Sequence, residues 1–451
     1  MRARGPLALL ALLAGLAAGG AEPTRAETLD GGRYGPVEVA LPGGDIRGYV
    51  VLFSDPEAPS RPVDPGPLTR AGALVVSVDT RAYFAAVRRD AKPCDQLVGD
   101  AEMLSRQLQR LHPGPDYDFP VLAGVGAGGT LAYAVLAQAP NNTLAGAAAL
   151  DPAPALSGIP PLCPGAPAAA EAGGATRYGP KPDLQGFWSV GFDAGASAAS
   201  RDAVAALAAA GVPTGRVDVG DAAPGAALAA LVQPHLSRAT TGGVAALPLV
   251  DLPAAHPGPL MAVVMSGDGG WRDIDKSIAE NLQQRGISVV GWDSLRYFWR
   301  EKTPEQTGDD MAAVLRAYLQ RWSARRVALI GYSFGADVMP SVYARLPQAL
   351  RDRVALVSLL GLEPKADWEI TVRGWLGEPP SDAGTPVASA LAHVPDGIVQ
   401  CIFGAEEPDS LCPGLPPGIE RVRMPGGHHF GGDYKVLADR IVEALTRRAG
   451  P

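Results

Sequence analysis

Short apolar runs separated by glycine-rich turns mark the second half of the chain. Residues 263–265, 327–330 and 399–404 are three such runs, and a helix-compatible segment starts at residue 336. Apolar runs of this length, bounded by turn signals, are typical of buried strands. Strands that alternate with helices predict a mainly parallel sheet flanked by helices, which is the α/β fold class.

The turn between the run 327–330 and the helix reads Gly-Tyr-Ser-Phe-Gly, from Gly331 to Gly335. A G-x-S-x-G sequence between a strand and a helix is the nucleophile elbow of hydrolases. The glycines let the strand and the helix approach closely around a serine that has strained backbone angles. We therefore predict that Ser333 is the nucleophile of a hydrolase.

A serine nucleophile needs a general base, which is usually histidine. The chain has only six histidines, and two of them, His428 and His429, are adjacent in the glycine-rich segment 426–430. We predict His428 as the base because Phe430 stands two residues after it, and His429 is the alternate. The other interpretation of the two histidines is a surface position or a metal-binding pair.

The histidine in turn needs a carboxylate that orients it, and in this architecture the acid lies between the serine and the histidine in the chain. The acidic segment 405–409 lies in that interval and follows the predicted strand 399–404. We favour Glu407, three residues after the end of the strand, as the acid, and Asp409 is the alternate.

Backbone N–H groups are needed to stabilise the negative charge that develops on the substrate oxygen. One belongs to the residue after the nucleophile, here Phe334, and the other to a loop after an earlier strand. The glycine-rich segment 266–271 follows such a strand, so we assign the second donor to the region of Gly267 and Asp268. The segment lacks the Lys and Ser/Thr spacing of a phosphate-binding loop, so it does not predict a nucleotide site.

The first half of the chain repeats these features without the serine. Residues 122–129 match residues 329–336, so Gly126 stands in the position of Ser333. Glycine has no nucleophilic side chain. The first copy is therefore predicted to be catalytically inactive and to cover the active site, stabilise the second copy or contact a partner.

The repeat predicts two tandem α/β-hydrolase-like domains. We expect a degenerate domain that lacks the nucleophile over residues 27–240 and a catalytic domain over residues 247–451, with the boundary in the segment 240–243. Both lengths fall within the usual size of a domain, which is about 50–250 residues.

The chain begins with the features of a secretory signal peptide over residues 1–26. A basic start, an apolar stretch of about a dozen residues and small residues near Ala21 and Ala26 follow one another. The apolar stretch is too short to span a bilayer, which takes ~20 apolar residues. We therefore expect an exported, soluble protein.

Four cysteines agree with export to an oxidising compartment. Cys401 and Cys412 bracket the acidic segment, and a disulfide between them is expected to fix its carboxylate. Cys94 and Cys163 are then expected to pair within the first domain. Free buried thiols are the alternative. No C-x-x-C motif occurs, and no metal or cofactor is predicted.

The composition describes a globular protein and disfavours two classes of partner. Of the 451 residues, 47% are hydrophobic and 19% are charged, and the net charge is −8. A net negative charge argues against direct binding of nucleic acid and against electrostatic adhesion to anionic membranes.

Several motifs together resemble the VirJ/AcvB family of bacterial periplasmic virulence-associated proteins. They occupy residues 266–273, 331–337, 401–412 and 426–430, and the two-copy length is similar to the longer AcvB form. The resemblance implies a periplasmic α/β-hydrolase that hydrolyses lysyl-phosphatidylglycerol, an aminoacyl-phospholipid of the membrane surface, and so acts in lipid homeostasis. It also implies a link to type IV secretion of DNA–protein complexes. Secretion-system or virulence proteins are therefore candidate partners, and a non-catalytic accessory role is the alternative.

The aminoacyl ester of such a lipid carries an ammonium group near the scissile carbonyl. Asp268 and Asp337 are the carboxylates closest in sequence to the oxyanion segment and the nucleophile, so we expect them to bind this cation. Trp271 is expected to contribute to an apolar wall for the acyl chains, although aromatic residues of this kind are more often part of the core.

Overall fold

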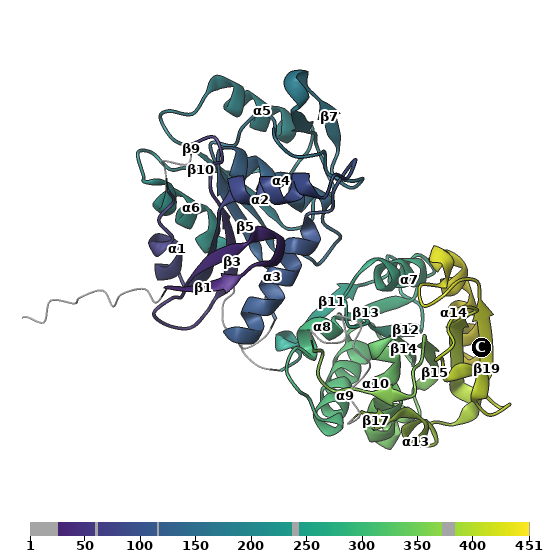
Figure 1. Ribbon diagram of the computed structural model, residues 1–451. Coiled ribbons are helices and arrows are strands. Elements are labelled where there is room, and N and C mark those ends of the chain that lie inside the picture. The colour runs from purple at the N-terminus through teal and green to yellow at the C-terminus, as the bar shows by residue number, and fades with distance from the viewer. Residues whose placement is uncertain (1–25, 59–61, 115–116, 237–242, 372–383, 451) are drawn as a thin grey trace, which may run out of the picture.

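The computed structural model describes residues 26–58, 62–114, 117–236, 243–371 and 384–450. Residues 1–25 of the predicted signal peptide and most of the predicted boundary segment lie outside these ranges. Figure 1 shows two bodies, each with one central sheet and helices packed on it. They are called here the first domain, which ends at residue 236, and the second domain, which begins at residue 243.

The first domain is built on an eight-stranded sheet in the order β1-β2-β4-β3-β5-β6-β9-β10. β2 is antiparallel to both β1 and β4, and the other neighbours are parallel. Its strands are β1 (Ala26–Asp30), β2 (Pro36–Ala40), β3 (Gly48–Phe53), β4 (Ala73–Val78), β5 (Val121–Val125), β6 (Gly146–Leu150), β9 (Phe187–Phe192) and β10 (Gly215–Asp218), with a separate hairpin of β7 (Ala168–Ala170) and β8 (Thr176–Tyr178). Its helices are α1 (Gly66–Arg70), α2 (Thr80–Arg89), α3 (Val98–Leu111), α4 (Ala127–Gln138), α5 (Ala198–Ala209) and α6 (Pro224–Val232).

The second domain is built on a seven-stranded sheet in the order β11-β13-β12-β14-β15-β18-β19. β11 is antiparallel to β13, and the other neighbours are parallel. Its strands are β11 (Leu249–Leu252), β12 (Leu260–Met265), β13 (Ser288–Trp292), β14 (Arg326–Tyr332), β15 (Val354–Leu360), β18 (Val399–Gly404) and β19 (Glu420–Met424), with a separate two-stranded antiparallel sheet of β16 (Lys365–Ala366) and β17 (Thr385–Pro386). Its helices are α7 (Asp273–Gln284), α8 (Ser294–Tyr297), α9 (Pro304–Arg321), α10 (Phe334–Arg345), α11 (Gln348–Arg351), α13 (Val387–Leu391) and α14 (Tyr434–Ala449).

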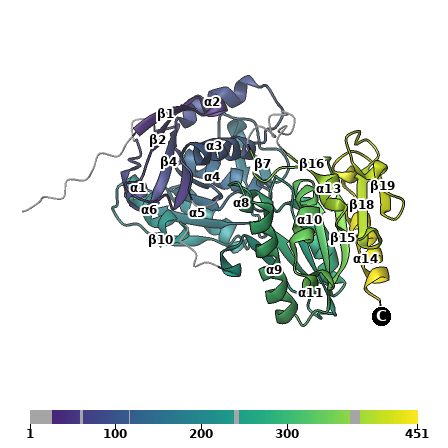
Figure 2. The same ribbon diagram turned by 90° about the horizontal axis from the view of Figure 1, so that it is seen from below.

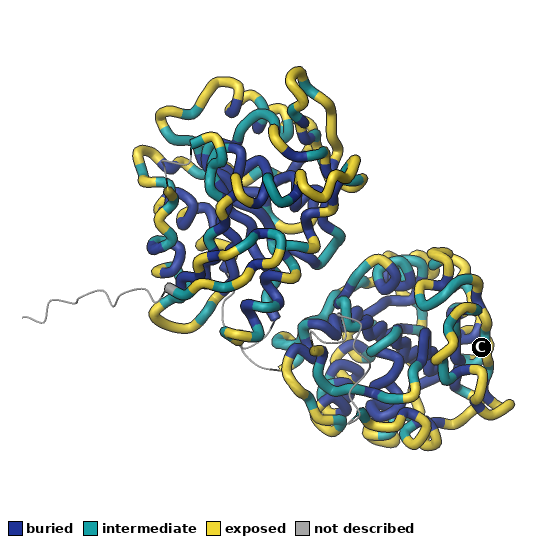
Figure 3. The backbone as a smooth tube through the Cα atoms, in the orientation of Figure 1, coloured by how far each residue is buried: buried dark blue, intermediate teal, exposed yellow. Residues whose placement is uncertain are grey.

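Helices cover both faces of each sheet, which explains the continuous apolar runs in the sequence. In β12, Met261, Val263 and Met265 share a core with α9 and α10, whereas Ala262 and Val264 share a core with α7 and α14. Figure 3 shows that the buried part of the backbone lies at the centre of each domain. Strands that are buried on both faces lack the polar alternation of a half-exposed sheet.

The two sheets repeat one order once the additional strand β1 is set aside. The series β2-β4-β3-β5-β6-β9-β10 corresponds to β11-β13-β12-β14-β15-β18-β19. A polar contact at the strand ends recurs as well. Ser54 Oγ accepts the N–H of Thr80 at 3.2 Å, and Ser266 Oγ accepts the N–H of Ser294 at 2.9 Å. The repeat in the sequence is therefore a repeat of an α/β fold.

The domains meet along α3 and the segment that follows it. Figure 2 shows the two domains against each other, with α8 of the second domain at the boundary. Arg110 of α3 donates to the carbonyl oxygen of Trp299 at 2.8 Å and lies over its indole ring. Tyr117 is 1% exposed and packs on the same ring, with 4.8 Å between the ring centroids. Tyr117 of the first domain therefore belongs to the core of the second.

Two features are absent from the described ranges of the chain. There, no helix has the length and apolar character that crossing a bilayer requires. The same residues contain no group of three or more His, Cys, Asp or Glu side chains arranged to hold a metal ion.

Both predicted disulfides are present. Cys94 pairs with Cys163 in the first domain, and Cys401 pairs with Cys412 in the second. The first bridge joins residues 69 positions apart, whereas the second closes a loop over 11 positions.

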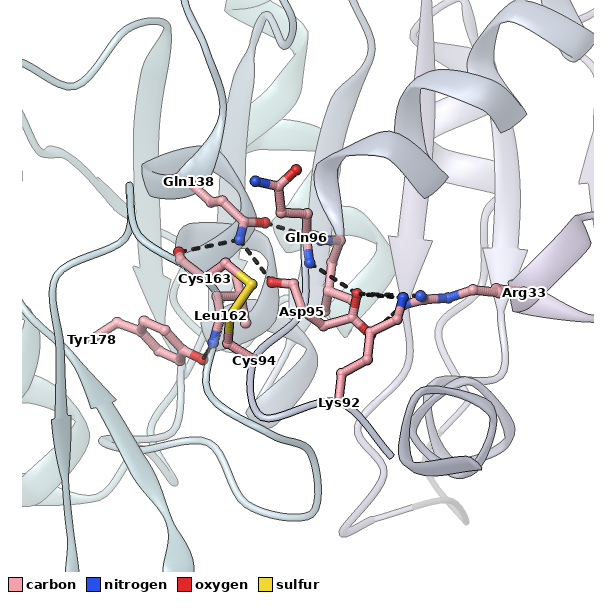
Figure 4. The surroundings of a disulfide bond; sticks show 10 residues. Arg33, Lys92, Cys94, Asp95, Gln96, Gln138, Leu162, Cys163 and Tyr178 are labelled. Atoms are coloured by element: carbon pink, nitrogen blue, oxygen red, sulfur yellow. Dashed lines mark hydrogen bonds and ion pairs between the residues drawn. A yellow bond between two sulfur atoms is a disulfide. The ribbon is translucent and has the colours of Figure 1, made fainter. Parts of the chain in front are cut away.

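A polar network surrounds the disulfide of the first domain, as Figure 4 shows. Gln138 Nε2 donates to the carbonyl oxygen of Asp95 at 2.8 Å, and the buried Asp95 carboxylate pairs with Arg33 at 3.1 Å. The N–H of Cys163 also donates to the Asp95 carbonyl oxygen, at 2.9 Å. The bridge and the network together fasten the segment before α3, the helix that contacts the second domain.

Replacement of both Cys94 and Cys163 by alanine is expected to destabilise the first domain by about 4 kcal/mol, because a bridge across a long loop restricts the unfolded chain. The measurement is urea unfolding of the full chain. Replacement of both Cys401 and Cys412 is the matched control and is expected to cost less, about 3 kcal/mol, because its loop is shorter. A first variant with the unfolding midpoint of the wild type would contradict the expectation.

Candidate active site

Ser333 lies between β14 and α10 with φ 52° and ψ −122°. Such angles cost of order 1–3 kcal/mol at a residue with a side chain, so the surrounding structure has to impose them. The two motif glycines explain how. A Cβ on Gly335 would overlap the backbone of Met265, and a Cβ on Gly331 would overlap the backbone of Gly335. The close approach that these glycines permit holds the serine at the end of β14.

His428 lies in the loop after β19 and contacts the serine. Its Nε2 is 2.8 Å from Ser333 Oγ, and its Nδ1 is 2.5 Å from Glu407 Oε1. Gly361, at φ +66°, gives the imidazole its room, because a Cβ there would lie 2.7 Å from His428 Cε1. In this arrangement the ring can accept the hydroxyl proton while the carboxylate fixes its orientation and tautomer.

Glu407 is held from two sides in the loop after β18. Its Oε2 accepts the N–H of Gly404 at 2.5 Å, and its side chain is 11% exposed. The disulfide between Cys401 and Cys412 closes the loop that carries it. These contacts fix the carboxylate that faces His428.

The structure thus brings together the three residues preferred from the sequence and places both alternates elsewhere. His429 is exposed, and its Nδ1 is 3.0 Å from the hydroxyl oxygen of Tyr332. Asp409 is exposed on the acidic loop, and the carboxylate in contact with His428 Nδ1 is that of Glu407.

The predicted oxyanion donors border the nucleophile. Phe334 is the first residue of α10, a position whose backbone N–H has no acceptor within the helix. A Cβ built on Gly267 would lie 3.4 Å from the Cβ of Ser333, so the loop after β12 passes directly beside the serine. Both segments lie where N–H groups can reach a carbonyl oxygen bound at Ser333.

Carboxyl groups surround this site, and sequence reasoning missed one of them, Glu363. Partial burial raises the pKa of the Glu363 carboxyl above its ordinary value. The nearby carboxylates of Asp409, Glu407 and Asp268 raise it further, whereas His428 opposes the shift. Glu363 stands three residues after the end of β15, the strand next to the elbow strand, and this strand-end position is the signal that could have found it.

The two carboxylates predicted to bind a cation lie at different depths. Asp268 is partly exposed, whereas Asp337 is 8% exposed and its Oδ1 accepts the N–H of Glu363 at 2.8 Å. Burial raises the pKa of Asp337 well above its ordinary value, and Glu363, Asp367 and Asp268 add to the shift. The expectation that Asp337 contacts a substrate directly is wrong, because this carboxyl is buried and anchors the segment that carries Glu363.

Trp271 does not line the site. Its side chain is 2% exposed, and a Cβ on Gly291 would lie 2.5 Å from its indole ring, so the ring packs closely on β13. The expectation of an acyl-chain wall at Trp271 is therefore wrong. Phe334, which follows the nucleophile, and Trp368 are partly exposed. Both pack on the buried ring of Phe298, with 4.8 and 6.1 Å between centroids.

The first domain keeps the backbone conformation of the elbow, but a glycine stands in the position of the serine. Gly126 has φ 57° and ψ −126°, close to the angles of Ser333. A Cβ on Gly126 would overlap the carboxylate of Asp55, which stands in the loop after β3 where the second domain has Gly267. The first domain therefore lacks both a nucleophile and the space for one.

Solved structures that resemble this chain include Est1E, a lipase and a proline iminopeptidase. Est1E from Butyrivibrio proteoclasticus with bound ferulic acid is 13% identical with a TM-score of 0.34, over 45% of this chain and 95% of that chain. The lipase BlEst2 from Bacillus licheniformis is 17% identical with a TM-score of 0.33, over 46% and 100%. Proline iminopeptidase from Mycobacterium smegmatis is 13% identical with a TM-score of 0.34, over 44% and 94%.

The sequence comparisons concern the second domain. No curated protein matches the chain. The family model described as bacterial virulence protein (VirJ) matches residues 259–449, which run from β12 to the end of α14. This range contains the elbow, the Glu407 loop and the His428 loop on the mainly parallel sheet of the second domain. Residues 259–449 of this chain are therefore similar to the VirJ family.

Proposed function

We propose that the second domain is a serine esterase that hydrolyses the aminoacyl ester of lysyl-phosphatidylglycerol in the periplasm. The hydrogen-bonded series of Ser333, His428 and Glu407 at a nucleophile elbow carries the reaction type. The VirJ match and the carboxyl groups around the serine support the substrate class. The two disulfides support an oxidising compartment outside the cytoplasm.

The first half of the proposed reaction transfers the lysyl group to the enzyme. Ser333 Oγ attacks the ester carbonyl carbon as His428 Nε2 takes the hydroxyl proton, and Glu407 stabilises the imidazolium that forms. The N–H groups of Phe334 and of the Gly267 loop stabilise the tetrahedral oxyanion. The intermediate then collapses, and His428 returns the proton to the leaving glycerol oxygen of phosphatidylglycerol. A lysyl ester on Ser333 remains.

The second half releases lysine. Water takes the place of the departed lipid headgroup, His428 accepts one of its protons, and the hydroxide oxygen attacks the lysyl carbonyl carbon. The second tetrahedral intermediate uses the same oxyanion donors. Its collapse expels Ser333 Oγ, which regains the proton from His428.

The carboxyl groups near the serine fit a cationic acyl group. Glu363 and Asp268 lie on two segments that flank the nucleophile, and neither belongs to the proposed triad. A carboxyl group that is partly buried beside other carboxylates is stabilised in its charged form by a nearby cation. The ammonium groups of a lysyl ester are such cations, whereas a fatty acyl ester has none.

A second candidate is a non-catalytic accessory protein for the secretion of DNA–protein complexes, with both domains as a binding platform. The first domain favours it in one respect, because its elbow is kept with Gly126 and Asp55 in place of a nucleophile. Labelling with a fluorophosphonate separates the two candidates. A label on the wild type that Ser333→Ala abolishes supports the esterase, and no label on either protein supports the platform.

Ser333→Ala is expected to lower hydrolysis of lysyl-phosphatidylglycerol by several orders of magnitude, because no other group supplies the nucleophile. The measurement is kcat with purified lipid in detergent micelles, alongside urea unfolding to show that the fold is retained. Turnover close to that of the wild type would remove Ser333 from the mechanism.

Two matched pairs of variants test the base and the acid. His428→Ala and Glu407→Gln are expected to lower kcat, the latter by about 10³–10⁴-fold, because the imidazole loses its oriented tautomer. His429→Ala and Asp409→Asn are the controls and are expected to change kcat little, since neither side chain contacts Ser333 or His428 Nδ1. The reverse pattern in either pair would transfer the role to the alternate.

The preference for lysyl over alanyl lipid is expected to depend on pH through Glu363. A charge-assisted contact with the additional ammonium contributes ~1.5–3 kcal/mol, or about one to two decades in kcat/KM. The pKa of Glu363 is raised above the ordinary glutamate value of about 4.3. As the pH falls, its carboxylate is therefore protonated at a higher pH than that of an ordinary glutamate. The preference is therefore present above this pKa and is lost below it.

The measurement is the ratio of kcat/KM for the two lipids as a function of pH, since titration of the triad cancels in the ratio. Glu363→Gln is expected to give a smaller ratio without the pH step, and Asp268→Asn a smaller ratio only. A wild-type ratio of one at every pH would show that the ammonium is not recognised at these carboxylates.

A further inference from the structure

The loop beside the nucleophile is tied to the first domain through its backbone. Asn142 lies between α4 and β6 of the first domain at φ 55°, and its Nδ2 donates to the carbonyl oxygen of Trp271 at 2.9 Å. Trp271 stands four residues after Gly267, the residue that borders Ser333. The contact therefore crosses from the inactive domain to the segment that carries a proposed oxyanion donor.

A second contact ties the next residue of the loop. The guanidinium of Arg272 pairs with the carboxylate of Glu102 on α3, and the same carboxylate pairs with Arg106 at 3.1 Å. The side chains of Arg272 and Glu102 are only 27% and 14% exposed. Water screens such a partly buried pair less than a surface pair. Two residues in succession are thus held by two separate elements of the first domain.

The loop is rich in glycine. Gly267, Gly269 and Gly270 supply three of the four residues before Trp271, and Gly270 has φ +84°. Glycine loses more conformational freedom on ordering than any other residue. Oxyanion donors act only when they are held in place before the charge develops. The contacts that the first domain makes with the end of this loop therefore affect how well its N–H groups are aligned.

We propose that the first domain positions the oxyanion loop, with Asn142 and Glu102 as the positioning residues. Neither residue touches the reacting atoms. Asn142 holds the carbonyl group of Trp271, and Glu102 holds the side chain of Arg272, so these contacts fix the end of the loop that borders Ser333. This role rests on the proposed serine hydrolysis, and it gives the domain without a nucleophile a part in the reaction.

Full-chain variants test the proposal. Asn142→Ala and Glu102→Gln are expected to lower kcat on a soluble nitrophenyl ester about tenfold, less than the 10²–10³-fold loss that follows complete removal of an oxyanion donor. KM is expected to stay within about twofold, because the oxyanion contact strengthens in the transition state. The affinity for an alkyl boronate, which forms a tetrahedral adduct with serine, is expected to fall by the same factor as kcat.

The matched control is Arg300→Gln. Arg300 also makes a hydrogen bond across the domain boundary, to the carbonyl oxygen of Gly114, but not to the Gly267 loop. It is expected to keep both kcat and boronate affinity. The double variant with Glu102→Gln and Arg272→Gln is expected to lose no more kcat or boronate affinity than Glu102→Gln alone, because the two side chains act as one pair.

Three outcomes would overturn the positioning role. Unchanged kcat and boronate affinity in Asn142→Ala and Glu102→Gln is the first. The second is an equal loss in Arg300→Gln, which would mean that any damage to the boundary acts alike. The third is a loss that disappears once the folded fraction from urea unfolding is taken into account. A wild type that neither hydrolyses the ester nor binds the boronate would instead refute the serine hydrolase itself, and the positioning role with it.

Discussion

The left-handed backbone at Ser333 is the constraint on which the second domain depends. A side chain at φ 52° is unfavourable, and it persists because β14, α10 and the end of β12 approach one another across glycines. That approach sets the serine hydroxyl 2.8 Å from His428 Nε2 and places the Gly267 loop beside it. The nucleophile, the base and the oxyanion donors therefore come from one packing arrangement.

The first domain has the fold of the second domain but a glycine in the position of the nucleophile. Its elbow has almost the same backbone angles, φ 57° at Gly126, and its sheet has the same strand order apart from the additional strand β1. Glycine adopts these angles without strain, and Asp55 fills the space of a nucleophile. What the first domain does contribute lies on another surface, where Asn142 and α3 contact the loop after β12. The duplicated fold is thus compatible with two different roles in one chain.

Much of the site could be predicted because its residues stand in a fixed relation to strand ends. The elbow, the order of acid and histidine, and both cysteine pairs are local in sequence or constrained by the fold, and the structure places them as expected. Depth below the surface was not predictable in the same way. Trp271 and Asp337 lie next to the site in sequence, but one fills the core and the other is buried behind Glu363. Glu363 itself carries no motif, and the position of β15 beside β14 in the sheet places it near His428.

The most direct test of the account is to identify the group that lipid turnover leaves on Ser333. Wild-type protein is mixed with lysyl-phosphatidylglycerol, quenched in acid within a single turnover, digested and analysed by mass spectrometry. The account predicts a lysyl ester on the peptide that contains Ser333, sensitive to hydroxylamine and absent from Ser333→Ala. A fatty acyl group on that peptide, or consumption of the lipid with no adduct at Ser333 and no loss of activity in Ser333→Ala, would contradict it.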